Sequence, residues 1–338
     1  MATDFDRAAH LAGFEAANAA KYQAADLGAK LATRNPKRLY FVGQGAPNKA
    51  MAVVKYWAER VSTALDLRIY YPAEFVNQNP AALDENTIVI LGSHSGTTPE
   101  TVRAAEFLRD TPVTTIGITQ KADSPLAKAV THPVLYGETL EGYTCGYILV
   151  QALVSALLQG TDGWTLHDKI MSSLDALPAV TADATEASDA RSVEEARLFK
   201  DDRVIYTVGA GPCFTTAYVL GVCVLMEMQW LHAQPLVAAE FFHGPFEVVD
   251  QTTPLIIFLG EDPSRPEAER VVRFCQKYTE RTMIYDSKDF AMDGVDPEVR
   301  AIVAPFVLQA AVDRFTARLA VWHNHPLSTR RYMWKTEY

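Results

Sequence analysis

The chain contains the same pattern of strands and glycine turns twice. The run LYFVGQGA, residues 39–46, resembles IYTVGAGP, residues 205–212, and the glycines coincide. Further on, IVILG, residues 88–92, resembles IIFLG, residues 256–260. Both pairs are separated by nearly half of the 338 residues. Such spacing indicates a duplicated supersecondary unit.

Each half alternates apolar strands with amphipathic helices, which is typical of parallel α/β layers covered on both faces. We therefore predict an α/β fold of two tandem domains, each with a doubly wound, mostly parallel sheet flanked by helices, as in flavodoxin-like folds. The predicted domains are residues 1–160, with the N-terminal helix and the first repeat, and residues 161–338, with linker helices, the second repeat and the tail. The expected strands are 38–43, 67–71, 87–92, 113–118, 203–208, 254–259 and 282–285. The expected helices are 8–33, 47–66, 98–109, a helical region 141–200, 213–232, 265–279 and 298–320.

One turn combines three hydroxyl side chains with two glycines. Ser93, Ser95 and Thr98 follow an apolar strand and precede a helical pattern. Such a junction offers unpaired N–H groups and the positive end of a helix dipole, and Gly92 and Gly96 allow a ligand to approach the backbone. Hydroxyls also cap helices, and Thr97 with Glu100 resembles a capping box. Three hydroxyls in this spacing nevertheless favour an anion site.

The ligand of this turn is more consistent with a monophosphate than with a nucleotide. No lysine follows the glycines, so the Walker pattern is absent. His94 lies within the turn and is a candidate substrate contact. Gly43 and Gly45 form a second glycine turn, but Asn48 stands where a dinucleotide fingerprint places its third glycine.

The repeat predicts that only the first copy binds an anion. Ser93 falls on Glu261, Ser95 on Pro263, and Thr98 on a second proline. A carboxylate and two prolines replace the hydroxyl donors, so the second turn is expected to serve as scaffold.

Glu227 is an isolated carboxylate in an apolar helix candidate. It is the only side chain between Ala217 and Leu231 expected to carry charge at neutral pH. Burial without a partner is costly and raises the pKa of a carboxyl group toward that of a useful general base. The alternative is a glutamate at the helix edge held in an ion pair or hydrogen bond.

His243 is the histidine with the most suggestive surroundings. It lies in EFFHGPFE, residues 240–247, where phenylalanines and a Gly-Pro turn indicate a shaped pocket rather than a solvated loop. A lone histidine is more often structural, but we take Glu227 and His243 as the candidate catalytic residues.

Composition excludes several classes of function. The net charge of -10 argues against a nucleic-acid partner. The four cysteines are widely spaced, which indicates a reducing compartment without structural zinc, and no group of residues has metal-ligand spacing. The acidic N-terminus lacks a signal-peptide pattern, and the longest apolar helix candidate is too short for a membrane span. We predict a cytoplasmic protein with no membrane partner and no metal.

The hydroxyl turn resembles a known family. Its sequence, SHSGTTPET, is similar to the phosphosugar-binding turn of sugar isomerase (SIS) domains, and two SIS domains in tandem resemble the isomerase half of glucosamine-6-phosphate synthase. The chain is most similar to bacterial fructosamine-6-phosphate deglycases, in particular the branch of fructoseasparagine 6-phosphate deglycases. The segments that carry this likeness are 123–126, 204–208, 226–230, 240–247 and 329–335.

The resemblance implies roles for individual residues. The three hydroxyls of the turn match the family's phosphate ligands, Glu227 its general base, and His243 its acid/base histidine. Ala46 and Pro47 replace a serine that binds substrate in many relatives, so this contact must come from backbone N–H groups or Asn48. Lys335, with the neighbouring arginines 330 and 331, is a candidate positive charge over the site, unless the tail is a solvated basic terminus. The resemblance also implies a homodimer with sites at the subunit interface, so Glu227 and His243 of one site come from either one chain or two.

The resemblance implies a deglycase, a hydrolase for a phosphosugar-amino acid (an Amadori compound), and chemistry of this kind, mainly proton transfer, needs no cofactor. The product is glucose 6-phosphate with a free amino acid, formed through an enaminol and hydrolysis of an imine. His243 assists ring opening, and Glu227 moves a proton between C1 and C2. An aldose–ketose isomerase or glucosamine-6-phosphate deaminase could use the same base, and a sugar-phosphate sensor would need no base. The amino acid on the sugar is not identified by the sequence.

Overall fold

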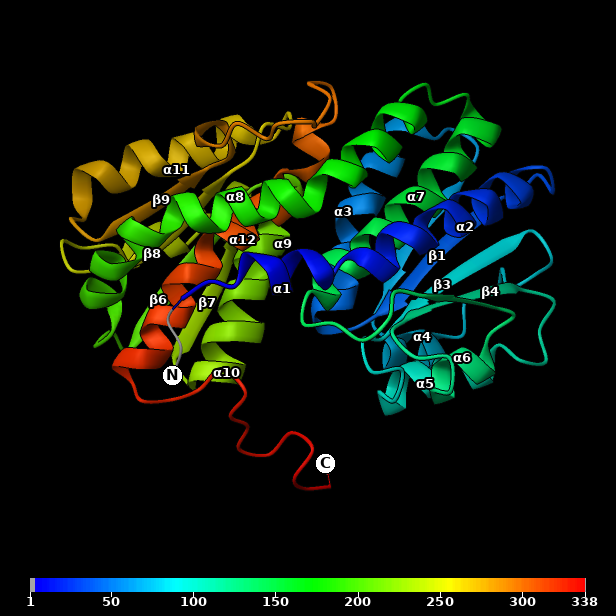
Figure 1. Cartoon of the computed structure of the whole chain (residues 1–338), viewed down its shortest axis with the longest axis horizontal. Coiled ribbons are helices and arrows are strands. Elements are labelled where there is room, and N and C mark those ends of the chain that lie inside the picture. Colours follow the sequence, from blue (N-terminus) through cyan, green and yellow to red (C-terminus); the bar gives the residue numbers. More distant parts are fainter. Residues whose placement is uncertain (1–3, 338) are drawn as a thin grey trace. The chain divides into compact units, whose positions relative to one another are not determined.

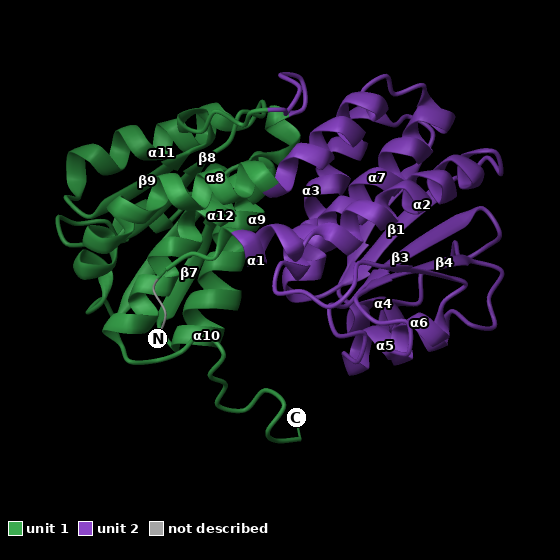
Figure 2. Cartoon of the chain, in the orientation of Figure 1, with its two compact units in different colours: residues 1–7, 179–293, 300–338 green, residues 8–178, 294–299 purple. Residues whose placement is uncertain are grey.

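The computed structural model describes residues 4–337, which form two compact units. Of these residues, 8–178 and 294–299 form the N-terminal unit, and 4–7, 179–293 and 300–337 form the C-terminal unit (Figure 2). The boundary falls at Pro178, inside the long helix α8 (His167–Phe199). The functional division into residues 1–160 and 161–338 stays a prediction.

The N-terminal unit contains a five-stranded parallel sheet in the order β2-β1-β3-β4-β5 (Figure 1). This order is that of flavodoxin-like folds, so the predicted fold class is confirmed. Gly43 and Gly92, the last residues of the two central strands, are register partners. The strands are β1 (Arg38–Gly43), β2 (Asp66–Tyr70), β3 (Thr87–Gly92), β4 (Thr114–Thr119) and β5 (His132–Leu135).

Helices cover both faces of this sheet, as Figure 1 shows. On one face, strand residues such as Tyr40 and Val89 pack with Phe75, Ala104 and Leu126 in a fully buried cluster. These last three residues belong to α4 (Pro72–Gln78), α5 (Pro99–Phe107) and α6 (Pro125–Ala129). The other face is covered by α2 (Glu15–Ala32), α3 (Gly45–Val61) and α7 (Gly142–Asp162), with the short α1 (Arg7–Ala12) before them.

The C-terminal unit repeats this architecture with four parallel strands in the order β7-β6-β8-β9. The order matches the first four positions of the other sheet, in agreement with the duplication in the sequence. The strands are β6 (Val204–Gly209), β7 (His232–Val237), β8 (Leu255–Leu259) and β9 (Thr282–Asp286).

The two faces of this second sheet are covered by different segments. On one face, the Thr207 hydroxyl donates to the carbonyl of Ala217 at 2.7 Å. On the other face, Val208 and Ile257 pack with Phe241 and with Val271 of α11. The first face carries a helical stretch of η1 (Gly211–Cys213), α9 (Phe214–Tyr218), the π-helix η2 (Val219–Met226) and α10 (Glu227–Gln229), with α12 (Arg300–Trp322). The second face carries η3 (Ala238–Glu240), η4 (Pro245–Val248) and α11 (Arg265–Tyr278), and η5 (Ser287–Asp289) follows β9.

Several expected boundaries were wrong. The predicted helix 8–33 is two helices, because the chain turns between α1 and α2. The predicted helix 213–232 ends at Gln229, because Trp230 adopts a left-handed conformation with φ 56°. Four short elements, α4, α6, β5 and β7, were not predicted. The two missed strands lie at sheet edges and contain Pro133 and Pro235, a residue confined to such positions because it cannot donate to a ladder.

The expectation that the longest apolar helix candidate is too short for a membrane span was wrong, because this candidate, which starts at Ala217, continues a helical stretch that begins at Gly211. Two helical stretches, Gly142–Asp162 and Gly211–Gln229, are long and apolar enough to cross a membrane by length and composition alone. Their apolar windows are 78% and 56% buried inside the protein. Burial of this extent is ordinary for core helices, so both stretches are accounted for by packing within the units.

Candidate active site

The two glycine turns of the N-terminal unit lie at the switch point of its sheet. Strand order reverses between β1 and β3, and ligands of open α/β sheets bind outside the carboxyl ends of the strands at this point. The turn after β1 begins beyond Gly43, and the hydroxyl turn begins at Ser93. The sequence therefore places its candidate phosphate ligands where this fold type binds them.

Hydrogen bonds within the hydroxyl turn hold its side chains in position. The Ser93 hydroxyl is 2.8 Å from that of Thr98 and accepts from the backbone N–H of Gly96 at 3.1 Å. The Ser95 hydroxyl is 2.8 Å from that of Thr97 and accepts from the Thr97 N–H. Ser93 is buried, whereas Ser95 and Thr98 are half-buried. Ser95 and Thr98 are thus the hydroxyls more accessible to a ligand.

The capping box predicted from Thr97 and Glu100 was wrong. Helix α5 begins at Pro99, so Thr98 is its N-cap residue, and its side chain makes no capping hydrogen bond. Glu100 instead accepts from the amide of Gln44 at 3.1 Å. Because Thr98 does not cap α5, the backbone N–H groups at the start of this helix are left to bind an anion.

Glycine is required at the centre of the turn. Gly96 has φ +68°, and a Cβ there would collide with Ser124. In the neighbouring turn Gly45 has φ +58° with open space around it. Asn48, considered as a substrate contact, is buried and donates to the carbonyl of Gly43 at 2.9 Å. Its amide therefore braces the turn, which leaves the backbone as the donor from this side.

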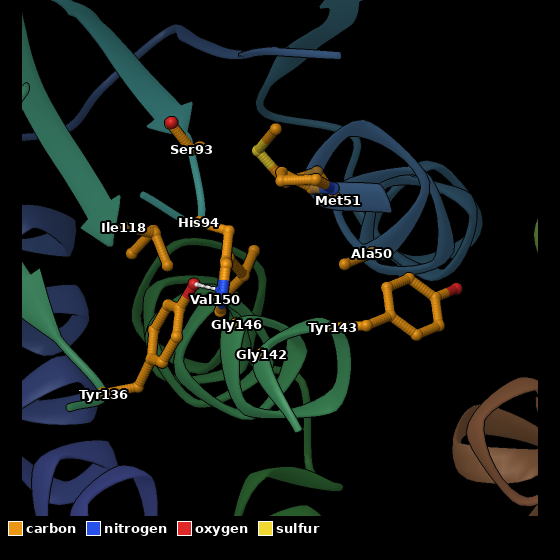
Figure 3. Close-up of a pocket in the computed structure, with 12 residues that line it drawn as sticks. Ala50, Met51, Ser93, His94, Ile118, Tyr136, Gly142, Tyr143, Gly146 and Val150 are labelled. Atoms are coloured by element: carbon orange, nitrogen blue, oxygen red, sulfur yellow. Dashed lines mark hydrogen bonds between the residues drawn. The ribbon is translucent and has the colours of Figure 1, made fainter. Parts of the chain in front are cut away.

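His94 lies against Tyr136, a partner that sequence reasoning missed. Its Nδ1 is 2.8 Å from the Tyr136 hydroxyl, and the rings stack with centroids 5.9 Å apart (Figure 3). Removal from water lowers the pKa of His94 and raises that of Tyr136. A lowered pKa favours the neutral form of the His94 imidazole. Tyr136 directly follows β5, and no spacing in the sequence linked it to the turn.

A small cavity of about 20 Å³ lies beside this pair, lined in part by Met51, Ser93 and Gly142 (Figure 3). This volume has room for about one water molecule. A sugar phosphate would therefore lie outside it, against the turn itself.

Glu227 lines a larger cleft in the C-terminal unit and pairs with Arg330 of the tail. Arg330 Nη2 is 3.0 Å from Glu227 Oε1, and the two side chains are 10% and 28% exposed. Burial raises the pKa of Glu227, and the positive charge of Arg330 opposes this rise. The cleft has a volume of about 550 Å³ and is lined by Met226, Glu227, Trp230, Leu231, His232, Arg330, Arg331, Tyr332 and Met333.

The helix before Glu227 is irregular. The eight residues of η2, Val219–Met226, form a π-helix that ends directly before this carboxylate. π-Helical turns occur frequently at functional sites, because they widen a helix and redirect its side chains.

His243 is placed differently from the pocket that the sequence predicted. It is exposed, and its neighbours Phe241 and Phe246 pack against Phe274 of α11 instead of enclosing it. Its loop covers the α11 face of the second sheet, whereas the helix of Glu227 covers the opposite face. Within residues 4–337 of one chain, neither a hydrogen bond nor an ion pair joins Glu227 to His243.

The tail docks at the Glu227 cleft. The Arg331 guanidinium lies 4.1 Å from the centre of the Trp230 ring. Lys335 is exposed, and its Nζ donates to the carbonyl of Arg330 at 2.6 Å. Arg330 is therefore the tail residue in contact with the candidate base, while Lys335 supports the backbone of Arg330.

Comparison with known proteins identifies relatives along most of the chain. Residues 33–157 match the family model of the SIS domain. Fructosamine deglycase FrlB of Bacillus subtilis (strain 168) is 37% identical over 302 residues, covering 89% of this chain and 92% of that protein. Fructoselysine 6-phosphate deglycase of Escherichia coli (strain K12) is 29% identical, covering 90% and 87%.

Two further relatives have names that denote reactions other than deglycation. Agropine synthesis conjugase of Rhizobium rhizogenes is 30% identical, covering 83% of this chain and 81% of that protein. A solved structure from Bacillus subtilis, named as that of a phosphosugar isomerase, superposes with a TM-score of 0.87 at 34% identity. It covers 94% of this chain and matches over 100% of its own length.

Proposed function

This chain belongs to the SIS domain family, and we propose that it is a deglycase for Amadori compounds that carry a 6-phosphate. The observation that carries the proposal is the similarity to fructosamine deglycase FrlB, which extends over 89% of this chain. The products would be glucose 6-phosphate and a free amine, normally an amino acid.

The hydroxyl turn is proposed to hold the phosphate. Ser93, Ser95 and Thr98 supply hydroxyl donors, and α5 supplies N–H groups at its positive end. Anchoring the substrate by its remote phosphate holds C1 and C2 against the base and reduces the entropy lost in the transition state.

Glu227 is proposed to move a proton between C1 and C2. Its carboxylate removes a proton from C1, and the C2 carbonyl oxygen gains one from His243, which gives an enaminol. Return of the proton to C2 gives an imine at C1. Water adds to C1, the C–N bond breaks, and the amine leaves with the proton it needs, while C1 becomes the aldehyde of glucose 6-phosphate. Apart from the attack of water and the cleavage of the C–N bond, each step is a proton transfer, the chemistry that a carboxylate with a raised pKa performs well.

We further propose a homodimer in which Glu227 and His243 of one site come from different subunits. The placement of their segments on opposite faces of one sheet supports this arrangement. It is tested by mixing two inactive variants, Glu227→Gln and His243→Asn, after dissociation and reassociation. Mixed dimers regain activity if the two residues of one site come from two chains, and stay inactive if both come from one chain.

The experiment that tests the function is an assay of glucose 6-phosphate release from a panel of fructose-amino acid 6-phosphates. Parallel assays measure ammonia from glucosamine 6-phosphate and the interconversion of aldose and ketose phosphates. Release from at least one Amadori compound at a rate well above the other two reactions supports the deglycase. Binding of phosphosugars without any turnover would identify a sensor instead.

A further inference from the structure

The cleft of Glu227 holds more positive than negative charge. Two guanidinium groups, those of Arg330 and Arg331, line it together with one carboxylate, and His232 adds an imidazole. The whole chain has a net charge of -10, whereas this cleft carries a surplus of positive charge. A cleft that carries surplus positive charge attracts an anion.

Arg330 is the buried member of the pair and has donor capacity to spare. Its Nη1 donates to the carbonyls of Leu327 and Thr329 at 2.8 and 3.0 Å, and its Nη2 pairs with Glu227. Its Nε is buried and has no acceptor among the described residues. A guanidinium with an unsatisfied donor is suited to a second, planar acceptor, because its fork matches the two oxygens of a carboxylate.

We propose that Arg330 binds the α-carboxylate of the amino acid part of the substrate and so selects Amadori compounds formed on α-amino groups. This inference rests on the proposed function. In such a compound the α-carboxylate hangs on the carbon next to the reacting nitrogen, close to C1. The Arg330 guanidinium lies 3.0 Å from Glu227, the base that acts on C1, so it is close enough to contact a carboxylate that lies near C1. When the sugar is instead attached to a lysine side-chain amine, the carboxylate lies at the far end of the chain and misses Arg330.

The two arginines differ in burial and in their distance from the base. Both guanidinium groups lie over a tryptophan ring, Arg331 at 4.1 Å from the centre of Trp230 and Arg330 at 5.5 Å from that of Trp334. Arg331 is exposed, whereas Arg330 is largely buried and contacts Glu227. Met226 and Met333 complete an apolar wall of the same cleft, which suits the side chain of an amino acid better than a second anion. Arg330 is therefore the carboxylate partner, and the wall receives the side chain.

Binding would also change the base. In the free protein the charge of Arg330 lowers the pKa of Glu227, against the effect of burial. When Arg330 turns to the substrate carboxylate, Glu227 shares its positive neighbour with a second anion and its pKa rises. The carboxylate thus becomes a stronger base only after the correct substrate has arrived.

The test compares two compounds that differ only in the carboxylate: the 6-phosphate Amadori compounds of alanine and of ethylamine. For the wild-type protein we expect kcat/KM to favour the alanine compound by about 10- to 100-fold, the usual effect of a hydrogen bond to a charged group. The variant Arg330→Gln should reduce this ratio to about threefold or less, whereas the neighbouring Arg331→Gln should keep it. The ratio is measured within one preparation, so loss of folded protein does not alter it.

A second pair extends the test to the position of attachment. Lysine linked through its α-amino group should be preferred over lysine linked through its side-chain amine, and Arg330→Gln should remove the preference. Equal wild-type rates for the alanine and ethylamine compounds would overturn the inference while leaving the deglycase function intact. Retention of the ratio in Arg330→Gln would overturn it as well. If no compound releases glucose 6-phosphate, the proposed function itself fails.

Discussion

The turn after β3 and the turn after β8 occupy corresponding positions in two copies of one fold, yet their chemistry is opposite. In the first, Ser93, Ser95 and Thr98 present hydroxyl groups beside the start of α5. In the second, Glu261 is bound by Arg300, whose Nη2 and Nε lie 2.9 and 3.1 Å from its two carboxylate oxygens.

The rest of the second turn is also saturated by contacts within the chain. Asp262 accepts from both the N–H and the hydroxyl of Ser264, at 2.9 and 2.5 Å. Arg265 pairs with Asp286 through Nη1 at 2.8 Å. The chain therefore supplies carboxylates of its own where the first copy offers donors. The comparison teaches that a duplicated scaffold keeps its strands and turns while two or three side chains change from hydroxyl donors to carboxylates, which under the proposed function leaves only the first copy as an anion site.

The largest expected effect tests whether the C-terminal unit supplies a catalytic residue, although its turn after β8 offers no anion site. Glu227→Gln removes the proposed base while keeping its size, so kcat should fall by about 10²- to 10⁴-fold with little change in substrate binding. The measurement is glucose 6-phosphate release from the alanine compound. The matched control is Glu280→Gln, an exposed glutamate of the same unit, which should leave kcat unchanged. A near-normal rate for Glu227→Gln would contradict the assignment.

The next effect tests whether the ion pair in the turn after β8 stabilises the fold without binding substrate. Arg300→Met leaves Glu261, whose side chain is only 18% exposed, without its charged partner. Loss of one member of a buried pair costs about 3 kcal/mol of unfolding free energy, measurable by urea denaturation. The double variant Glu261→Met with Arg300→Met should recover much of this loss, and KM should stay constant in both. An increase in KM for these variants would indicate that the second turn also binds substrate.

A smaller effect tests whether the hydroxyl turn after β3 binds the substrate phosphate. Ser95→Ala removes a half-buried donor and should raise KM by about tenfold or more, because a hydrogen bond to a charged phosphate is lost. The control in the other copy is Ser264→Ala, next to Pro263, the residue aligned with Ser95; the Ser264 hydroxyl already donates to Asp262. That variant should keep KM unchanged. Equal behaviour of the two variants in saturation kinetics would break the comparison.

The smallest effect concerns pH. A general base acts when deprotonated, so activity falls as pH drops through the pKa of Glu227, which burial raises above its ordinary value. Arg330 lowers this pKa, and Arg330→Gln should therefore move the acidic limb of kcat/KM to higher pH. His232 and Arg331, the other basic groups of the cleft, are unchanged in the variant. The pH profile is measured with the ethylamine compound, which has no carboxylate. An acidic limb at the same pH in Arg330→Gln and in the wild type would show that Arg330 does not lower the pKa of Glu227.

The central strands were predictable, as were the edge strands β2 and β9, whereas the edge strands β5 and β7 were not. A strand between two parallel neighbours is buried on both faces and reads as a continuous apolar run, as in 88–91 and 256–259. Strands β5 and β7 lie at sheet edges, and each contains a proline and polar residues. The proline interrupts the apolar pattern in β5 and β7, so their sequences carry a weaker strand signal than those of the edge strands β2 and β9, which contain no proline.

The site divides in the same way. The hydroxyl turn is local, so Ser93 to Thr98 could be identified from one short segment, although the capping box expected from Thr97 and Glu100 does not form. The contact of His94 with Tyr136 and that of Glu227 with Arg330 join residues far apart along the chain. No periodicity or spacing encodes such pairs.

By itself, the sequence determined the duplication, the α/β class and the position of the one turn rich in donors, because these depend on hydrophobic patterning and on neighbouring residues. The tertiary structure alone decided which groups meet: it set Arg330 against Glu227, closed the second turn with Arg300, and put the segments of Glu227 and His243 on opposite faces of one sheet. Each of these outcomes depends on where segments that are distant in the sequence pack against the sheet. Burial and charge then act only on the groups that this packing brings within a few ångströms of each other.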